Sequence, residues 1–82
     1  MGTAAIAART EAKGVLDRVH WTLLDARRGP DLTEERRTEL AEISGWLQIA
    51  LSQYGRDHDR DRLITERGRD YLKKIGVDPL HW

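Results

Sequence analysis

The 82-residue sequence contains no cysteine and no phenylalanine, and it has only two prolines and one methionine. Without cysteine there is no disulfide framework, no thiolate zinc site and no cysteine nucleophile. The formal net charge is zero, because fourteen Lys and Arg residues balance fourteen Asp and Glu residues. This balance argues against a strongly basic nucleic-acid tail and against an acidic mimic of nucleic acid.

Long apolar runs are missing as well. The first residues lack the charged region and apolar stretch of a secretory signal, and no run is long enough to span a membrane. We therefore expect a soluble, cytoplasmic protein with no membrane partner. A chain of this length forms one domain, residues 1–82, whose core supplies only about 3–5 kcal/mol of net stability. Association with another chain is a usual supplement when disulfides and metals are absent.

Glycine and proline divide the chain into three segments. The breaks lie at Gly29-Pro30, at Gly55 and at Gly76, because proline disfavours helix before it and glycine permits the left-handed backbone that ends a helix. Apolar residues repeat at the period of an α-helix in the segments 3–28, 32–54 and 62–75. The spacing predicts an all-α domain of three helices: a long antiparallel helical hairpin plus a shorter third helix.

The periodic positions define the predicted core. They are Ala5, Ala8, Ala12, Val15, Leu16, Val19, Leu23 and Ala26 in the first segment, Leu40, Ile43, Leu47, Ala50, Leu51 and Tyr54 in the second, and Ile64, Gly68, Tyr71, Leu72 and Ile75 in the third. Small or short polar residues beside the second stripe predict a close helix contact there: Ala41, Ser44, Gly45, Gln48 and Ser52.

Helix ends are predicted from capping residues. Asp31 stands three residues before Glu34, which predicts a capping-box start for the second helix. One aspartate of the charged run 57–61 is expected to serve as the N-cap of the third helix. Gly76 is expected to end that helix in the left-handed conformation.

Residues able to perform chemistry are few. The alternating aspartates from Asp57 to Asp61 are similar to the start of a calcium loop, but Arg62 stands where that loop needs glycine and Gly68 where it needs a bidentate glutamate. The three histidines are scattered singly, and no glycine-rich phosphate loop is present. His20 lies at the edge of the first stripe, where a histidine is commonly half-buried. We expect no catalytic residue, metal site or cofactor, and hence no enzyme.

The tryptophans are the most informative side chains. On a helical wheel Trp21 lies about 180° from the centre of its stripe, among charged residues, and Trp46 lies about 90° from its own. Tryptophan beside arginine is typical of interface hot spots. The predicted partner-binding residues are Trp21, Arg18, Arg28, Trp46, Ile49 and Trp82. The alternative is that the third helix or the C-terminal tail covers Trp21 and the first helix covers Trp46.

Two stretches resemble DNA-binding regulators. Residues 37–54 resemble a helix-turn-helix unit in spacing, with the turn at Gly45, and residues 63–72 look like the junction that follows the wing of winged-helix proteins, with Thr65 as a helix cap. Against this, the expected recognition helix from Leu47 to Tyr54 has no basic residue. The basic residues available for nucleic acid under this alternative are Arg56, Arg60, Arg62, Arg67 and Arg69.

The sequence favours a protein–protein interaction module. We expect a self-associating adaptor, or a regulator or inhibitor that docks on a larger protein, of the kind that phages and mobile elements encode. Its partner is another copy of itself, as a homodimer or higher assembly, a larger protein, or both. A DNA-binding transcriptional regulator is the alternative.

Overall fold

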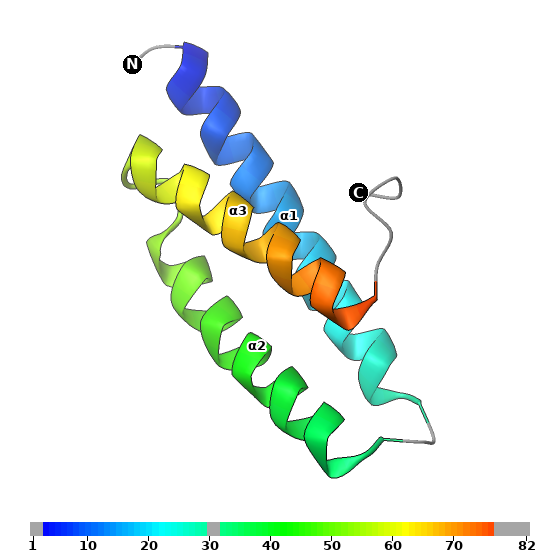
Figure 1. The fold of residues 1–82 in the computed structure, drawn as a ribbon. Helices are drawn as coiled ribbons and strands as arrows, with labels where there is room; N and C mark the ends of the chain where they lie inside the picture. Colours follow the sequence, from blue (N-terminus) through cyan, green and yellow to red (C-terminus); the bar gives the residue numbers. More distant parts are fainter. Residues whose placement is uncertain (1–2, 30–31, 77–82) are drawn as a thin grey trace.

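Three helices make up most of the part of the chain that the structure describes. The structure, a computed structural model, describes residues 3–29 and 32–76, with side chains from residue 6 onward, and contains α1 (Thr3–Arg27), α2 (Glu34–Gln53) and α3 (His58–Ile75). Helices α1 and α3 run side by side in the same direction, and α2 runs antiparallel to both (Figure 1). The predicted all-α, three-helix fold is confirmed, and the closest packing joins α1 to α3.

The core follows the predicted stripes. Leu16, Val19, Ile43 and Leu72 are at most 1% exposed and form its centre. Ala26, Tyr54 and Tyr71 pack half-buried around it, while the side chain of Ala5 lies outside the described residues. Leu51 was predicted to be buried and is 45% exposed. The reason is that α2 packs mainly against α1 and barely touches α3, so it buries only a narrow strip.

The close helix contact forms on α3 instead of α2. The predicted band on α2 is exposed except for half-buried Ser44, and a Cβ placed at Gly45 would meet nothing within 4 Å. At Gly68, by contrast, an added Cβ would overlap Cγ1 of Val15 on α1. Only glycine at position 68 therefore lets the backbone of α3 approach α1 this closely.

Two helix starts differ from the predicted ones. The N-cap of α2 is Thr33, whose Oγ1 accepts a hydrogen bond from the Arg36 N–H at 3.1 Å. The predicted cap, Asp31, lies outside the described residues, and Glu34 is the first helical residue. Helix α3 begins four residues earlier than expected, because Asp57 caps it by accepting from the Asp59 N–H at 3.1 Å. At the other end Gly76 adopts φ +98°, as predicted.

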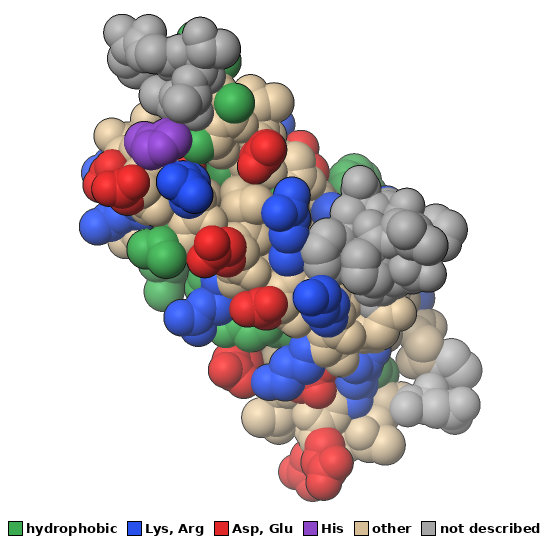
Figure 2. Space-filling model, turned by 45° about the horizontal axis from the view of Figure 1, so that its top comes forward, with side chains coloured by type: hydrophobic (Ala, Val, Ile, Leu, Met, Phe, Trp, Pro, Cys, Tyr) green, Lys and Arg blue, Asp and Glu red, His purple; other side chains and the backbone are tan. Residues whose placement is uncertain are grey.

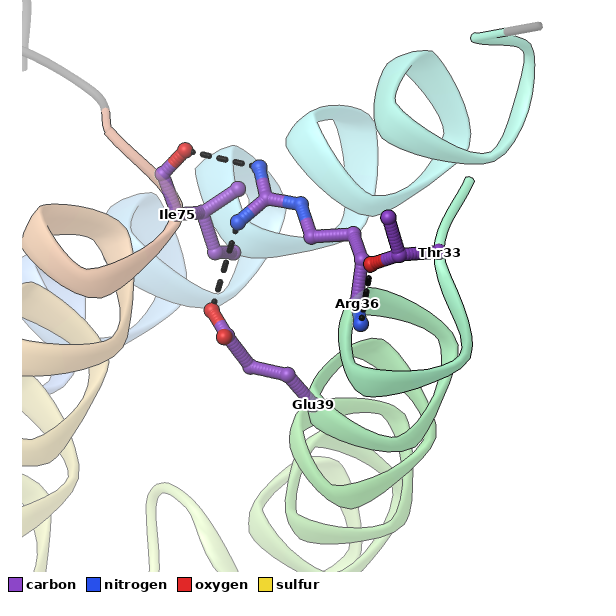
Figure 3. A network of polar contacts seen from close by, with 4 residues as sticks. All are labelled: Thr33, Arg36, Glu39 and Ile75. Atoms are coloured by element: carbon purple, nitrogen blue, oxygen red, sulfur yellow. Dashed lines mark hydrogen bonds and ion pairs between the residues drawn. The ribbon is translucent and has the colours of Figure 1, made fainter. Parts of the chain in front are cut away.

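Arg36 connects the start of α2 to the end of α3 (Figure 3). Its Nη2 donates to the carbonyl oxygen of Ile75 at 2.9 Å, and its Nη1 donates to Glu39 Oε1 at 3.3 Å. The last carbonyls of a helix have no partner within the helix and carry its negative dipole end. The guanidinium therefore satisfies one of them and tethers two helices that otherwise touch little.

Removing this tether is expected to destabilise the fold. Because the bond is charge-assisted and half-buried, Arg36→Ala should lower the free energy of unfolding by about 1–2 kcal/mol. Arg37→Ala, at the exposed neighbouring position, is the matched control and should change it by less than about 0.5 kcal/mol. Urea unfolding followed by circular dichroism measures both. Equal effects of the two substitutions would show that the Ile75 contact does not stabilise the protein.

Candidate functional site

The outer side of α1 presents Trp21. Its side chain is 62% exposed, and the neighbouring His20 ring meets it edge-on, with ring centroids 5.4 Å apart. His20 is itself exposed, although its position predicted half-burial. Trp21, Asp25 and Arg28 share one exposed side of the helix. We call this side the Trp21 face.

The other residues predicted with Trp21 lie elsewhere. Arg18 is half-buried at the edge of the Trp21 face and lines, with Arg69 and Leu72, a hollow of about 210 Å³ between α1 and α3. Trp46 and Ile49 belong to α2 and stand apart from Trp21. Trp82 lies outside the described residues. The predicted partner-binding residues therefore divide between α1 and α2.

Trp46 packs against α3. Its ring lies 5.1 Å from that of Tyr71, at 57°, and its Cη2 would be 3.3 Å from a Cβ at Gly68. The alternative prediction, that the first helix covers Trp46, is wrong. The flank of α2 that carries Trp46 faces α3 instead. Ile49, one turn further on, is 59% exposed.

A surface groove runs between α2 and α3. It comprises two adjoining hollows of about 560 and 330 Å³, and Leu63 and Arg67 line both. We call it the α2–α3 groove; Glu42, Trp46 and Gln53 line it from α2, and Arg60, Leu63 and Arg67 line it from α3. Leu63 was not predicted as an interface residue, although its helical position, far from the buried stripe of α3, pointed to its exposure. Leu63 is 63% exposed.

The basic residues do not form one surface. Arg60 and Arg67 line the α2–α3 groove, whereas Arg69 lies against α1 and Arg62 shares its side of α3. Arg56 is exposed in the turn before α3. Acidic and basic side chains are interspersed over the face drawn in Figure 2.

The helix-turn-helix expectation is wrong. Helix α2 continues through Gly45 without a turn, because its buried stripe keeps one helical period from Leu40 to Ala50. The winged-helix expectation fails as well, since Thr65 is buried inside α3 and its Oγ1 donates to the Asp61 carbonyl at 3.0 Å. The residues directly before the 63–72 stretch belong to the first turns of α3, which begins at His58.

Two aspartates of the run 57–61 stabilise the fold through hydrogen bonds to the backbone. Asp57 caps α3, and Asp61, only 2% exposed, accepts a 2.7 Å hydrogen bond from the Gly55 N–H. Gly55 has φ +84°, so this bond holds the left-handed turn between α2 and α3. Among the described residues no group of three or more His, Asp or Glu is arranged to hold a metal ion.

A fourth hollow lies where the first half of α1 meets the turn before α3. Its volume is about 560 Å³, and Arg9, Lys13, Asp17, Asp57 and His58 line it. Lys13 and Asp17 form an ion pair at 3.3 Å. His58 Nδ1 is buried without a hydrogen-bond partner in the described structure. Because this lining carries charges of both signs, it does not single out one class of ligand.

The comparisons with known proteins supply no relative. No family model, curated protein or solved structure matches this chain. In the part of the chain that the structure describes, no helix is both long and apolar enough to cross a membrane. The Trp21 face and the α2–α3 groove are therefore assessed on their own chemistry.

Proposed function

We propose that this protein is a small, non-enzymatic adaptor or regulator that associates with itself and docks on a larger protein. The supporting observation is the exposure of large apolar side chains on two separate surfaces, with Trp21 at 62%, Ile49 at 59% and Leu63 at 63%. Tryptophan beside arginine is typical of binding hot spots, and exposed isoleucine and leucine gain free energy when a partner removes them from water. Two surfaces suit an adaptor that contacts two partners.

The thin contact between α2 and α3 also supports self-association. A three-helix core of this size is marginally stable on its own, and α2 packs against it along a narrow strip. A second chain that covers the exposed flank of α2 would add buried apolar area at about 25 cal/mol per Å².

The remaining features of the proposal come from the sequence. Without cysteine the fold does not depend on an oxidising compartment, so we place the protein in the cytoplasm. A phage or mobile-element origin stays a hypothesis that its small size motivates. We do not favour DNA binding. Helix α2 is continuous and so contains no separate recognition helix, and the arginines of α3 lie on different sides of that helix.

The mass of the purified chain in solution tests self-association. We expect sedimentation equilibrium at micromolar concentration to give a mass above the 9.4 kDa of one chain, falling toward it on dilution. The apparent melting temperature should rise with concentration, because assembly favours the folded state. A stable 9.4 kDa species at all concentrations would contradict self-association.

A further inference from the structure

The α2–α3 groove has an apolar floor with exposed apolar edges. Trp46 and Tyr71, both half-buried, meet at 5.1 Å where the helices touch. Leu63 lines the groove from α3, and helical position places Ile49, one turn after Trp46, on the outer side of α2 beside this contact. Both side chains are more than half exposed. The surface therefore offers an aromatic centre between two aliphatic side chains, which a packed helix would bury.

The two helices that border the groove carry opposite net charge. Helix α2 has four acidic and two basic side chains, a net charge of −2, and α3 has four acidic and six basic, a net charge of +2. Glu35 and Glu42 are spaced by two helical turns on the groove flank of α2. On α3 the spacing by two turns recurs at Arg60, Arg67 and Lys74.

The groove charges are not paired within the chain. Glu42, Arg67 and Lys74 line the same hollow, in which Arg67 and Lys74 stand two helical turns apart on α3. The ion pairs that form in the described residues are Lys13–Asp17 and Arg36–Glu39, and neither involves these three. Glu66 and Asp70 also line this hollow from α3, so the α3 side of it carries two acidic and two basic side chains. The basic excess along the groove comes from Arg60 in the adjoining hollow.

We propose that the occupant of the α2–α3 groove is a second copy of this chain, placed so that α2 of each copy lies against α3 of the other. This inference rests on the self-association proposed above. A twofold axis parallel to the helices brings the acidic flank of α2 opposite the basic flank of α3, antiparallel and at the same height. Glu42 then faces Arg67 of the second copy, and Glu35 faces Lys74.

The opposite-charge flanks select this arrangement over the other face-to-face dimer. A twofold axis perpendicular to the helices would bring α2 against α2 and α3 against α3, with like charges opposed. Charged residues that flank an apolar seam decide the pairing and orientation of helices in this way. The dimer encloses the exposed Ile49 and Leu63 in a four-helix layer and leaves Trp21 outside.

A charge exchange between two chains tests this arrangement. Glu42→Arg and Arg67→Glu each place like charges opposite each other twice per dimer, so each variant alone should self-associate at least about tenfold more weakly. An equimolar mixture should recover wild-type affinity, because every facing pair is again of opposite sign. Sedimentation velocity, with one variant carrying a fluorescent label, measures the dissociation constants of each variant and of the mixture.

Controls separate folding from association. Arg37→Glu, an equal charge change on the flank of α2 away from the groove, should leave the dimer unchanged, and circular dichroism should show wild-type helicity for every variant. Should either variant unfold, Glu35→Arg with Lys74→Glu tests the same pairing two turns away.

The outcomes are distinct. A wild-type dimer that neither variant weakens would overturn the groove interface and leave self-association standing. Weakening without recovery in the mixture would overturn the pairing of α2 with α3. A wild-type chain that stays monomeric at all concentrations would overturn self-association itself.

Discussion

Replacing Gly68 by alanine is expected to destabilise the protein by up to about 2 kcal/mol net, because overpacking a close helix contact typically costs about 1–3 kcal/mol. The new Cβ would overlap Val15 Cγ1 and lie 3.3 Å from Trp46 Cη2. Valine in a helix has one strongly preferred rotamer, so Val15 has little freedom to turn away. The helix-propensity gain of about 1 kcal/mol for alanine over glycine offsets part of this cost.

Gly45→Ala is the matched control. Gly45 is also inside a helix, but a Cβ there meets nothing within 4 Å, so this variant should gain about 0.5–1 kcal/mol. Thermal unfolding at fixed concentration should therefore shift in opposite directions for the two glycines. Because both changes are glycine to alanine, both variants gain the same helix propensity. The difference between their stabilities therefore reports the packing at position 68.

A double substitution locates the strain at Val15. Val15→Ala removes the overlapping methyl group and leaves the Val15 Cβ at 3.6 Å, an ordinary contact distance, from a Cβ at position 68. The pair Val15→Ala and Gly68→Ala should therefore be more stable than the two separate losses in stability would predict. A Gly68→Ala protein as stable as the wild type would show that α1 and α3 do not depend on this approach.

The helices and most of the core could be predicted from the sequence, because burial on one face imposes a period of 3.6 residues. Leu16, Ile43 and Leu72 were found in this way, as was the outward position of Trp21. The turn at Gly76 was predictable because few residues adopt positive φ. Each of these predictions depends only on residues that are close to one another in the sequence.

Contacts between distant residues were not predictable in the same way. Several glycines occupy helix interiors, and only the three-dimensional packing shows that Gly68, and not Gly45, meets another helix. The Arg36 contact with the Ile75 carbonyl joins residues 39 positions apart. Asp61 lies in a charged run that predicts exposure, yet it is buried because the Gly55 N–H needs an acceptor.

The two candidate surfaces also differ in how far the sequence predicts them. The exposure of Trp21 and Ile49 follows from helical position. The α2–α3 groove does not, because it depends on how far α2 stands from α3. Trp46 shows both effects: its displacement from the stripe was visible in the sequence, but its partners Tyr71 and Gly68 were not.

Replacing Trp21 by alanine is expected to leave the fold intact and to remove docking on the larger protein. Substitution of an exposed residue usually changes stability by less than about 0.5 kcal/mol, whereas a buried Trp→Ala change costs about 3–5 kcal/mol. Because Trp21 is 62% exposed, the helicity and melting temperature of the variant should match the wild type. The mass of the self-associated form should also be unchanged, since the Trp21 face lies outside the α2–α3 groove.

The affinity for the larger protein, by contrast, should fall strongly in the Trp21→Ala chain. A hot-spot tryptophan contributes about 2 kcal/mol or more, which is at least about a thirtyfold change in dissociation constant. The experiment first compares the proteins that wild-type and Trp21→Ala chains capture from a cell lysate. Calorimetry then measures the affinity of each purified captured protein for both chains.

Arg27→Ala, at an exposed position on another side of α1, is the matched control and should retain binding within a few-fold. Equal affinity for the wild-type and Trp21→Ala chains would exclude the Trp21 face as the docking surface. Loss of folding at every concentration would instead make Trp21 part of the core. The contrast between an unchanged melting temperature and a thirtyfold weaker complex is what separates a contact residue from a structural one.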